Sequence, residues 1–429
     1  MIILTFLSVL ILGIVIGMPI AYSLVMCGAV MMLQMGIFDT QIIAQNMILG
    51  IDNFLLLAIP GFILAGELMN RGGLSRRIID VALSFCGHIS GGLGYVGIFS
   101  ALILASLSGS AIADSAALAA ILVPMMRRAG YPDGRSCGLL AAGGVIAPII
   151  PPSIAFIVYG AVANISISKM FMAGIFPGLV MGGSLILAWF FVTRGEDYAR
   201  LPRKSWGERW GSLLAGVPAL VLPLLIIGGL RFGIFTPTEA AIVAAAYALF
   251  AGAVIYRELS WKAFVECLVS SARTSAVVMF LIGASGVSGW LIVTANLPNM
   301  IIEAMGPFMG QPMLVVAMLM VITLVLGMVL DFTPLMLILM PVAVPIVSAA
   351  GVDLVYFGVV FIMAGALGLL TPPVGNVLNV VAGVSRTPMD KVIPGVMPFL
   401  AAEVVVVILL VLFPALVSWP LQQMLSVGR

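Results

Sequence analysis

Two short polar stretches interrupt long apolar runs of the sequence and carry the groups best suited to bind an ion. The residues are Ser106, Ser108, Ser110 and Asp114 in the first stretch, and Gly327, Asp331 and Thr333 in the second. Hydroxyl and carbonyl oxygens are the ligands that hard cations prefer. Acidic side chains in otherwise apolar segments are candidate functional groups as well. The two stretches are therefore the first places to look for a binding site.

Each polar stretch is followed by a pair of adjacent prolines, Pro151-Pro152 and Pro372-Pro373. A proline in a helix cannot donate to the carbonyl four residues back. The pairs should therefore free the carbonyls of Ala147, Pro148, Gly368 and Leu369. An interrupted membrane helix offers such carbonyls to Na⁺ and its new N–H ends to an anion. Neutral side chains that add possible ligands nearby are Ser153, Thr371, Asn376 and Asn379.

We expect each polar stretch to face its nearest proline pair, which gives two Na⁺ sites and one substrate site. The first Na⁺ site would use Ser106, Ser108, Ser110, Ala147, Ile150 and Ser153. The second would use Gly327, Gly368, Thr371 and Val374. The substrate site would use Asp114, Pro151, Pro152, Thr333, Pro372, Pro373 and Asn376. No basic residue lies within these motifs, so an anionic substrate would rely on helix N-termini and hydroxyls.

The composition indicates that membrane-spanning helices carry these motifs. Of the 429 residues, 62% are hydrophobic and 8% are charged, against roughly 25% charged in soluble proteins. At about 20 residues per crossing, the chain is one polytopic membrane protein without a soluble domain. A net charge of +2 argues against a nucleic-acid partner. The single histidine and four scattered cysteines give no other metal site, and we expect no cofactor.

The two halves of the chain resemble each other. The segment from Asp114 to Pro124 matches the segment from Asp331 to Pro341 at five of eleven positions. The proline pairs and a later Pro-Gly recur in the same order. Basic residues follow the first segment (Arg127, Arg128 and Arg135), but the equivalent stretch after Pro341 has only Asp353. Because basic loops stay in the cytoplasm, the repeats should be inverted, as in many secondary transporters.

The expected fold is all-α, with two re-entrant hairpins and two broken helices in inverted repeats. The first repeat, residues 1–193, would hold a hairpin at about 106–128 and a broken helix at about 139–163. A basic amphipathic connector over residues 194–211 should lie on the cytoplasmic surface as a helix. The second repeat, residues 212–429, would hold a hairpin at about 327–349 and a broken helix at about 354–384. Ordinary kinked helix pairs, with Asp114 and Asp331 as caps, are the alternative.

Five stretches along the chain resemble the large membrane subunit of tripartite ATP-independent periplasmic (TRAP) transporters. They are NFLLLAIPGFILAG (53–66), GSAIAD (109–114), PIIPPS (148–153), GIFTPTEAA (233–241) and LTPP (370–373). The resemblance implies Na⁺-driven uptake of an organic acid, such as a sialic acid, C4-dicarboxylate or sugar acid, across the bacterial inner membrane. It also implies an elevator fold of the ion-transporter-superfamily kind. Implied partners are a periplasmic binding protein and a small four-helix membrane subunit.

Three other functions are weighed against this one. An H⁺-coupled or exchange transporter would use Asp114, Asp331 or Glu239, although Thr236-Pro-Thr-Glu239 has the pattern of a helix cap. An ion channel could line a pore with the hairpins, but inverted halves fit alternating access better. The chain has no His pair, no Cys–His pair and no clustered carboxylates, so we do not expect an enzyme.

Overall fold

The structure, a computed structural model, describes residues 2–196 and 198–426, and every element in them is a helix. In the first half these are α1 (Ile2–Val15), α2 (Ile20–Met35), α3 (Thr40–Ile51), η1 (Phe54–Leu57), α4 (Ala58–Arg71), α5 (Leu74–Cys86), α6 (Gly92–Ser108), α7 (Ala111–Arg128), α8 (Asp133–Gly144), α9 (Ile154–Val162) and α10 (Ile167–Thr193). In the second half they are α11 (Trp206–Arg231), α12 (Pro237–Phe250), η2 (Ala251–Ile255), α13 (Trp261–Thr294), α14 (Leu297–Ala304), α15 (Gly306–Met309), α16 (Pro312–Gly327), α17 (Phe332–Ala349), α18 (Leu354–Leu370), α19 (Asn376–Ser385), α20 (Met389–Leu412) and α21 (Ala415–Ser426).

Seven of the described helices are long and apolar enough to cross a membrane. They begin at Phe54, Ile167, Trp206, Pro237, Trp261, Phe332 and Met389. Large apolar side chains such as Leu187, Phe191 and Leu224 are exposed on these helices, as lipid contact requires. The predicted all-helical, multi-pass membrane fold is thereby confirmed. Whether the hairpins enter and leave the membrane on one face stays a prediction.

The same order of elements occurs in both halves at a constant spacing. Helix α7 begins at Ala111 and ends at Arg128, and α17 begins and ends 221 residues later, at Phe332 and Ala349. Helices α8 and α18 begin at the same spacing, as do α3 and α13. Each half therefore contains a helical hairpin (α6–α7 or α16–α17), an interrupted helix (α8–α9 or α18–α19) and a long helix (α10 or α20). The exact limits of the repeats stay a prediction.

Equivalent elements of the two halves run antiparallel. Helices α3 and α4 lie along α13, which takes the same place in the second half. Arg71 at the end of α4 forms an ion pair with Glu266 near the start of α13. Gly50 in α3 lies near the other end, where a Cβ on it would be 3.3 Å from the Gly283 Cα. Residue numbers thus rise along one element as they fall along the other, which is the relation expected of inverted repeats.

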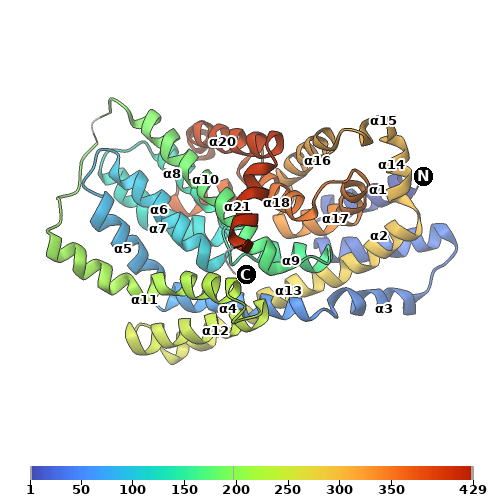
Figure 1. Ribbon diagram of the computed structural model, residues 1–429, viewed down its shortest axis with the longest axis horizontal. Helices are drawn as coiled ribbons and strands as arrows, with labels where there is room; N and C mark the ends of the chain where they lie inside the picture. Colours follow the sequence, from blue (N-terminus) through green and yellow to red (C-terminus); the bar gives the residue numbers. More distant parts are fainter. Residues whose placement is uncertain (1, 197, 427–429) are drawn as a thin grey trace.

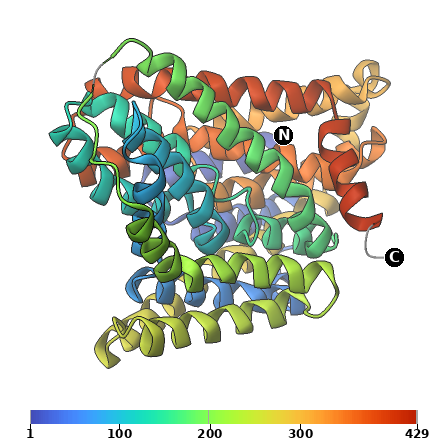
Figure 2. The ribbon, with the colours of Figure 1, turned by 60° about the vertical axis from the view of Figure 1, so that its left-hand side comes forward.

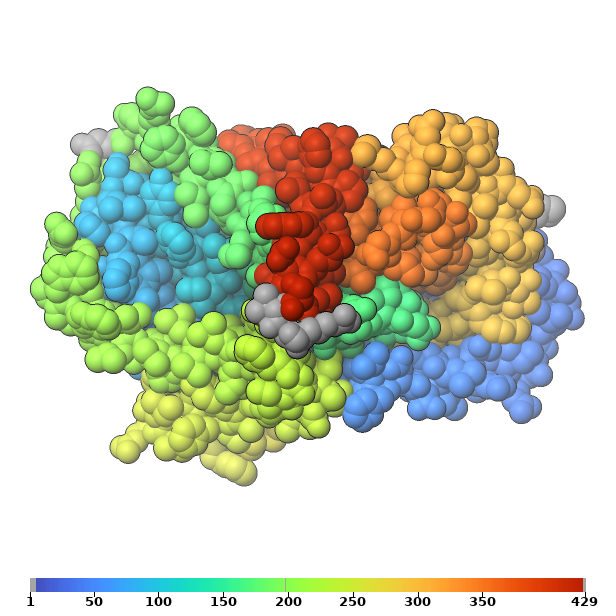
Figure 3. Space-filling model, in the orientation of Figure 1, coloured from blue at the N-terminus to red at the C-terminus, as the bar shows by residue number. Residues whose placement is uncertain are grey.

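The helices form two layers (Figure 1; Figure 2). Helices α3, α4, α11, α12 and α13 run along the lower side in Figure 1, and the hairpins, interrupted helices and α20 lie above them. Figure 3 shows the first and middle parts of the sequence along the lower edge and the C-terminal part above the centre. The hairpins are thus held against a layer of long helices drawn from both halves.

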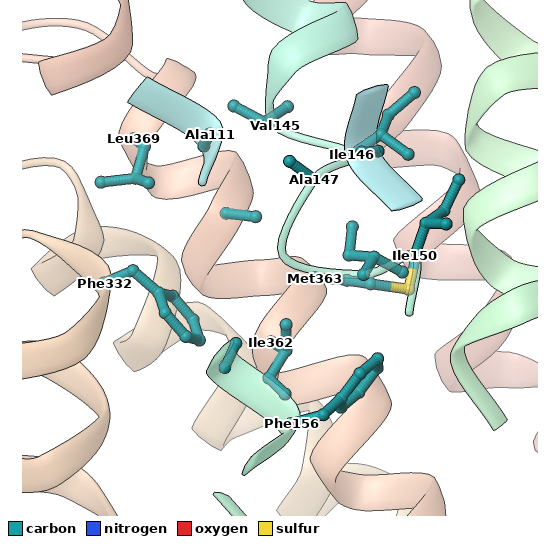
Figure 4. Close-up of a cluster of buried hydrophobic side chains, with 14 of the residues drawn as sticks. Ala111, Val145, Ile146, Ala147, Ile150, Phe156, Phe332, Ile362, Met363 and Leu369 are labelled. Atoms are coloured by element: carbon teal, nitrogen blue, oxygen red, sulfur yellow. The ribbon is translucent and has the colours of Figure 1, made fainter. Parts of the chain in front are cut away.

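The core of the upper layer is apolar where the two halves meet (Figure 4). Ala111 and Phe332, the first residues of α7 and α17, are buried there. Val145 and Ile146, just after α8, are fully buried, as is Met363 of α18. Burial of such side chains stabilises a fold by about 1.5–3 kcal/mol each in water. The hairpin starts and the interrupted helices therefore share one close-packed centre.

Among the described residues of the predicted surface helix (194–211), only those from Trp206 onward are helical. The described residues between 194 and 205 are not helical, and the Ala199 N–H donates to the Ala129 carbonyl at 3.1 Å. Helix formation starts only at Trp206, because Ser205 and Glu208 form a capping box there. The tryptophan-bearing part of the connector is therefore the first turn of the 26-residue helix α11.

Candidate functional site

The first hairpin turns at Gly109 and Ser110 and packs against the first interrupted helix. Gly109 has a φ of +62°, and a Cβ there would lie 3.0 Å from the Pro152 carbonyl oxygen. Only glycine allows both the turn and this approach without strain. Ser110 begins α7 by accepting a hydrogen bond from the Ala113 N–H at 3.3 Å. The structure thus brings the first polar stretch against the first proline pair.

Asp114 lies buried in the first turn of α7. Its Oδ1 accepts a hydrogen bond from the Ser108 hydroxyl at 2.5 Å. Its Oδ2 is buried and has no hydrogen-bond partner among the residues that the structure describes. Ser110 caps the helix, so Asp114 is not the cap that the kinked-helix alternative requires. The carboxyl oxygen is therefore free to receive a cation or a proton.

The first interruption covers residues 145–153, between α8 and α9, and is buried throughout. The Pro148 carbonyl, which the sequence predicted to be free, accepts a hydrogen bond from the Ser153 hydroxyl at 2.5 Å. Ser153 is one of the proposed cation ligands. Its hydroxyl proton is therefore directed at the backbone, and its lone pairs stay available to a cation.

The second hairpin and the second interrupted helix form a similar junction, which is the place where the two elements meet. A Cβ on Gly327, at the end of α16, would lie 3.1 Å from the Gly368 Cα of α18. The Gly375 N–H, just before α19, donates to the Met328 carbonyl at 3.3 Å. The second hairpin therefore also meets the interrupted helix of its own half. Asp331 caps α17 by accepting from the Phe332 N–H at 2.8 Å, as the kinked-helix alternative proposes for this residue.

The proposed ligands of the second cation site already form hydrogen bonds. The Gly368 carbonyl accepts from the Thr371 N–H at 3.0 Å. The Val374 carbonyl accepts from the Asn379 side chain at 2.9 Å. The Thr371 hydroxyl donates to the Leu367 carbonyl at 2.7 Å. A carbonyl oxygen has two lone pairs, so these bonds position the ligands and leave capacity for a cation.

A cavity of about 190 Å³ lies where both hairpins meet the layer of long helices. Three helix N-termini border it, those of α7, α9 and α17, and Ser110 and Thr333 add hydroxyl groups. Helices α4 and α13 close the cavity with Ile63, Thr274 and Val278. Helix N-termini carry partial positive charge and unpaired N–H groups, so they attract anions. The Asp331 carboxyl also lines the cavity, so groups that attract an anion and a group that attracts a cation meet there.

Some of the predicted site residues lie apart from this cavity. Ser106 and Ile150 line a separate apolar cavity, and the Ser106 hydroxyl donates to the Ile103 carbonyl at 2.6 Å. Of the predicted substrate residues, Thr333 lines the central cavity in the described part of the chain. The others are not among its lining residues; they are Asp114, Pro151, Pro152, Pro372, Pro373 and Asn376.

Helix α13 contributes residues that the motif analysis missed. Thr274 lines the central cavity and also a neighbouring cavity of about 350 Å³. Arg71 and Arg273 line the neighbouring cavity. Arg71 pairs with Glu266, whereas Arg273 is exposed and has no ion pair among the described residues. The polar run from Ser270 to Ser275 inside a long apolar helix was the available signal.

Inverted halves, paired hairpins and interrupted helices around a buried cavity are together the build of a membrane transporter. The family model of the tripartite ATP-independent periplasmic transporter, DctM component, matches residues 7–416. The chain therefore belongs to the DctM family and is a large permease of a TRAP transporter. Its relatives are transporter permeases, and it is not an enzyme.

Relatives support this assignment along the whole length. The 2,3-diketo-L-gulonate TRAP transporter large permease protein YiaN of Escherichia coli is 50% identical over 98% of this chain and 99% of its own. The sialic acid TRAP transporter large permease protein SiaM of Vibrio cholerae is 38% identical over 93% of both chains. The isethionate TRAP transporter permease protein DctMQ of Oleidesulfovibrio alaskensis is 34% identical, but this chain covers only 64% of it.

A solved structure shares the fold. The YdaH transporter of Alcanivorax borkumensis has a TM-score of 0.62 over 88% of both chains, with 15% sequence identity. At that identity the likeness concerns the arrangement of helices alone. It shows that the all-helical architecture occurs in an experimentally determined membrane transporter.

Proposed function

We propose that this permease takes up an organic acid across the bacterial inner membrane, driven by a Na⁺ gradient. The observation that carries the proposal is the central cavity, where three helix N-termini and two hydroxyl groups converge beside the Asp331 carboxyl. An anion there replaces water around groups that already carry partial positive charge. The relatives named above transport a sugar acid, a sialic acid and a sulfonate, all of them anions. We choose a sugar acid such as 2,3-diketo-L-gulonate as the first substrate to test.

The proposed Na⁺ sites are the two junctions between a hairpin and an interrupted helix. At the first junction, Asp114, Ser110 and Ser153 supply oxygens. At the second, the oxygens come from Gly368, Thr371 and Val374. Ordered carbonyl and hydroxyl oxygens suit a hard monovalent cation. A cation at each junction would also offset the negative charge of a carboxylate substrate in the cavity between them.

We further propose that the hairpins and interrupted helices move as one body against the layer of α4, α11, α12 and α13. The central cavity lies at the boundary between these parts, so such a movement would carry the substrate across. The family is tripartite by its description. A periplasmic binding protein would therefore deliver the acid, and a small four-helix membrane subunit would brace the layer of long helices.

The test is uptake of radiolabelled 2,3-diketo-L-gulonate by vesicles that hold the permease with its small subunit, with the binding protein outside. An inward Na⁺ gradient should drive accumulation, and an equal K⁺ gradient should not. Accumulation that follows only a proton gradient would replace Na⁺ by H⁺ and favour Asp114 or Asp331 as carriers. If neither gradient drives uptake of this acid or of a sialic acid, the proposal fails.

A further inference from the structure

Helix α20 carries an acidic residue inside the protein that the proposed transport sites do not use. The Glu403 side chain is completely buried. It lies two helical turns after Val396, whose Cα would be 2.6 Å from a Cβ on Gly138 of α8. It also lies two turns before Leu410, whose carbonyl accepts the Tyr356 hydroxyl of α18 at 3.1 Å. Residues seven apart share one side of a helix, so Glu403 faces the space between α8 and α18.

This position lies between the two interrupted helices, because α8 is the first part of one and α18 is the first part of the other. Each of these helices ends at an interruption, so the carbonyl ends near the centre carry partial negative charge. The neighbouring centre is built from apolar side chains, including Val145, Ile146 and Met363 (Figure 4). Neither the helix ends nor the packing favours a carboxylate there.

Neither carboxyl oxygen of Glu403 has a hydrogen-bond partner within the described residues. The elements that pack on α20 are α8, α10, α16, α18, α19 and α21. The titratable and charged residues on these elements and on α20 itself are Asp133, Arg135, Cys137, Lys169, Tyr356, Asp390 and Lys391. Three of these residues already have partners. Arg135 pairs with Glu196, Cys137 contacts Ser385 and Tyr356 donates a hydrogen bond to the Leu410 carbonyl.

The lysines are too far along their helices to pair with this carboxyl. Lys391 precedes Glu403 by twelve residues, or about 18 Å of helix. Lys169 lies in the first turn of α10, twenty residues before Trp189, whose ring lies 6.1 Å from the ring of Phe399. Glu403 is therefore a buried carboxyl without a cationic partner.

An unpaired carboxylate in an apolar interior costs far more than its neutral acid. A bound Na⁺ would need several oxygen ligands, and the packed side chains here are apolar. We propose that Glu403 is a proton-binding site, occupied by a proton in this conformation, and that it makes the permease sensitive to alkaline pH. Ionisation would place a bare charge between the two interrupted helices and loosen the body that they form.

Infrared spectroscopy of the purified full chain, with carbon-13 in the glutamate carboxyl groups, tests this directly. Carbon-13 lowers the C=O frequency of the glutamate carboxyls alone, so the difference between labelled and unlabelled protein excludes Asp114 and Asp331. The other glutamates pair, cap helices, accept a hydrogen bond or are exposed; they are Glu67, Glu196, Glu208, Glu239, Glu258, Glu266 and Glu303. We expect a labelled carboxylic-acid C=O band at neutral pH. Its absence would overturn the proposal.

Two variants show whether the band comes from Glu403 and whether this residue makes the stability depend on pH. Glu403→Gln replaces the acid by a neutral amide of the same shape and should abolish the band. The wild type should lose thermal stability as the pH rises from 7 to 10, and Glu403→Gln should lose clearly less. Glu303→Gln, on the exposed face of α14, is the matched control and should behave as the wild type does. Equal pH dependence of all three proteins would contradict a proton site at Glu403, and if Glu403→Gln does not fold, the wild-type band decides alone.

Discussion

At the scale of single residues, the contact between Ser108 and Asp114 sets the chemistry of the first junction. The Ser108 hydroxyl donates to one carboxyl oxygen, and the other is buried without a partner in the described part of the chain. A buried oxygen without a partner lowers the stability of the fold unless a ligand binds to it. We interpret the free oxygen as the place where the first cation binds.

Replacing Asp114 by Asn should therefore remove the contribution of the first site to the Na⁺ dependence of the permease and keep its fold. At a Na⁺ concentration ten times the Kd, a site stabilises the folded state by about 1.4 kcal/mol, and Asp114→Asn should lose most of this gain. Thermal unfolding with and without Na⁺ measures it. Asp39→Asn, at the exposed cap of α3, serves as the control. A full Na⁺ response in Asp114→Asn would exclude the carboxyl as a ligand.

Arg273 is a basic residue without an ion pair among the described residues, and it shares a cavity with Thr274, which also lines the central cavity. A hydrogen bond to a charged group contributes about 1.5–3 kcal/mol. Arg273→Gln should thus raise the KM for the acid about tenfold or more, with a smaller effect on kcat. Lys262→Gln, exposed near the start of the same helix, should leave the KM unchanged. Equal KM values in the two variants would show that Arg273 does not guide the anion.

At the scale of helices, the start of α12 shows whether Glu239 caps a helix or is available to carry a proton. Thr236 accepts from the Glu239 N–H at 3.3 Å, and the Glu239 carboxylate accepts from the Thr236 N–H at 2.8 Å. Both hydrogen bonds of a capping box are therefore present. This geometry accounts for Glu239 without any role in proton transport.

The Glu239→Gln variant should therefore leave uptake and its pH dependence unchanged, because glutamine forms the same capping box. Initial rates of acid uptake across a pH series measure this. Glu239→Ala should lower the melting temperature by removing the cap and still transport. Loss of uptake in Glu239→Gln with normal folding would instead make Glu239 a proton carrier.

The sequence predicted most of these helices because their signals are local. Ser110 and Asp331 mark helix starts, and the two proline pairs mark interruptions. The proline pairs lie 221 residues apart, as the equivalent helices do. Asp114 and Asp331 lie 217 residues apart, so the sequence match between their segments is four residues out of register with α7 and α17. The Pro148 carbonyl accepts a hydrogen bond from the Ser153 hydroxyl, about which a pattern of prolines contains no information. Its second lone pair stays available to a cation.

Contacts between distant elements set the rest of the site, which the motifs did not reveal. Thr274 and Ile63 reach the central cavity because α4 and α13 cross beneath both hairpins. The surroundings of Ile63 are apolar, and the polar run around Thr274 does not show which element it faces. Likewise, Ser106 resembles its neighbours Ser108 and Ser110 in the sequence, but it lies on a side of α6 that borders a different cavity. Tertiary packing, not local composition, decides these positions.

At the scale of the whole molecule, the antiparallel packing of α3 and α4 on α13 predicts that equivalent loops lie on opposite sides of the membrane. Arg128 and Ala349 end α7 and α17, are both exposed and lie 221 residues apart. Single cysteines at these positions, in a chain whose native cysteines are replaced, test the topology in intact cells. An impermeant thiol reagent should label Ala349→Cys directly and Arg128→Cys only after permeabilisation. Labelling of both from one side would mean parallel repeats.

The central claim is that the two junctions between hairpins and interrupted helices bind Na⁺. Thermal unfolding of the purified permease in NaCl and in choline chloride, at equal ionic strength, tests it without knowledge of the substrate. A ligand that binds only the folded state raises its stability by RT ln(1 + [L]/Kd). We expect a higher melting temperature in NaCl, and a smaller rise when Pro151 and Pro152 are both replaced by Ala. Coincident unfolding curves in the two salts over a wide range of concentrations would contradict the account.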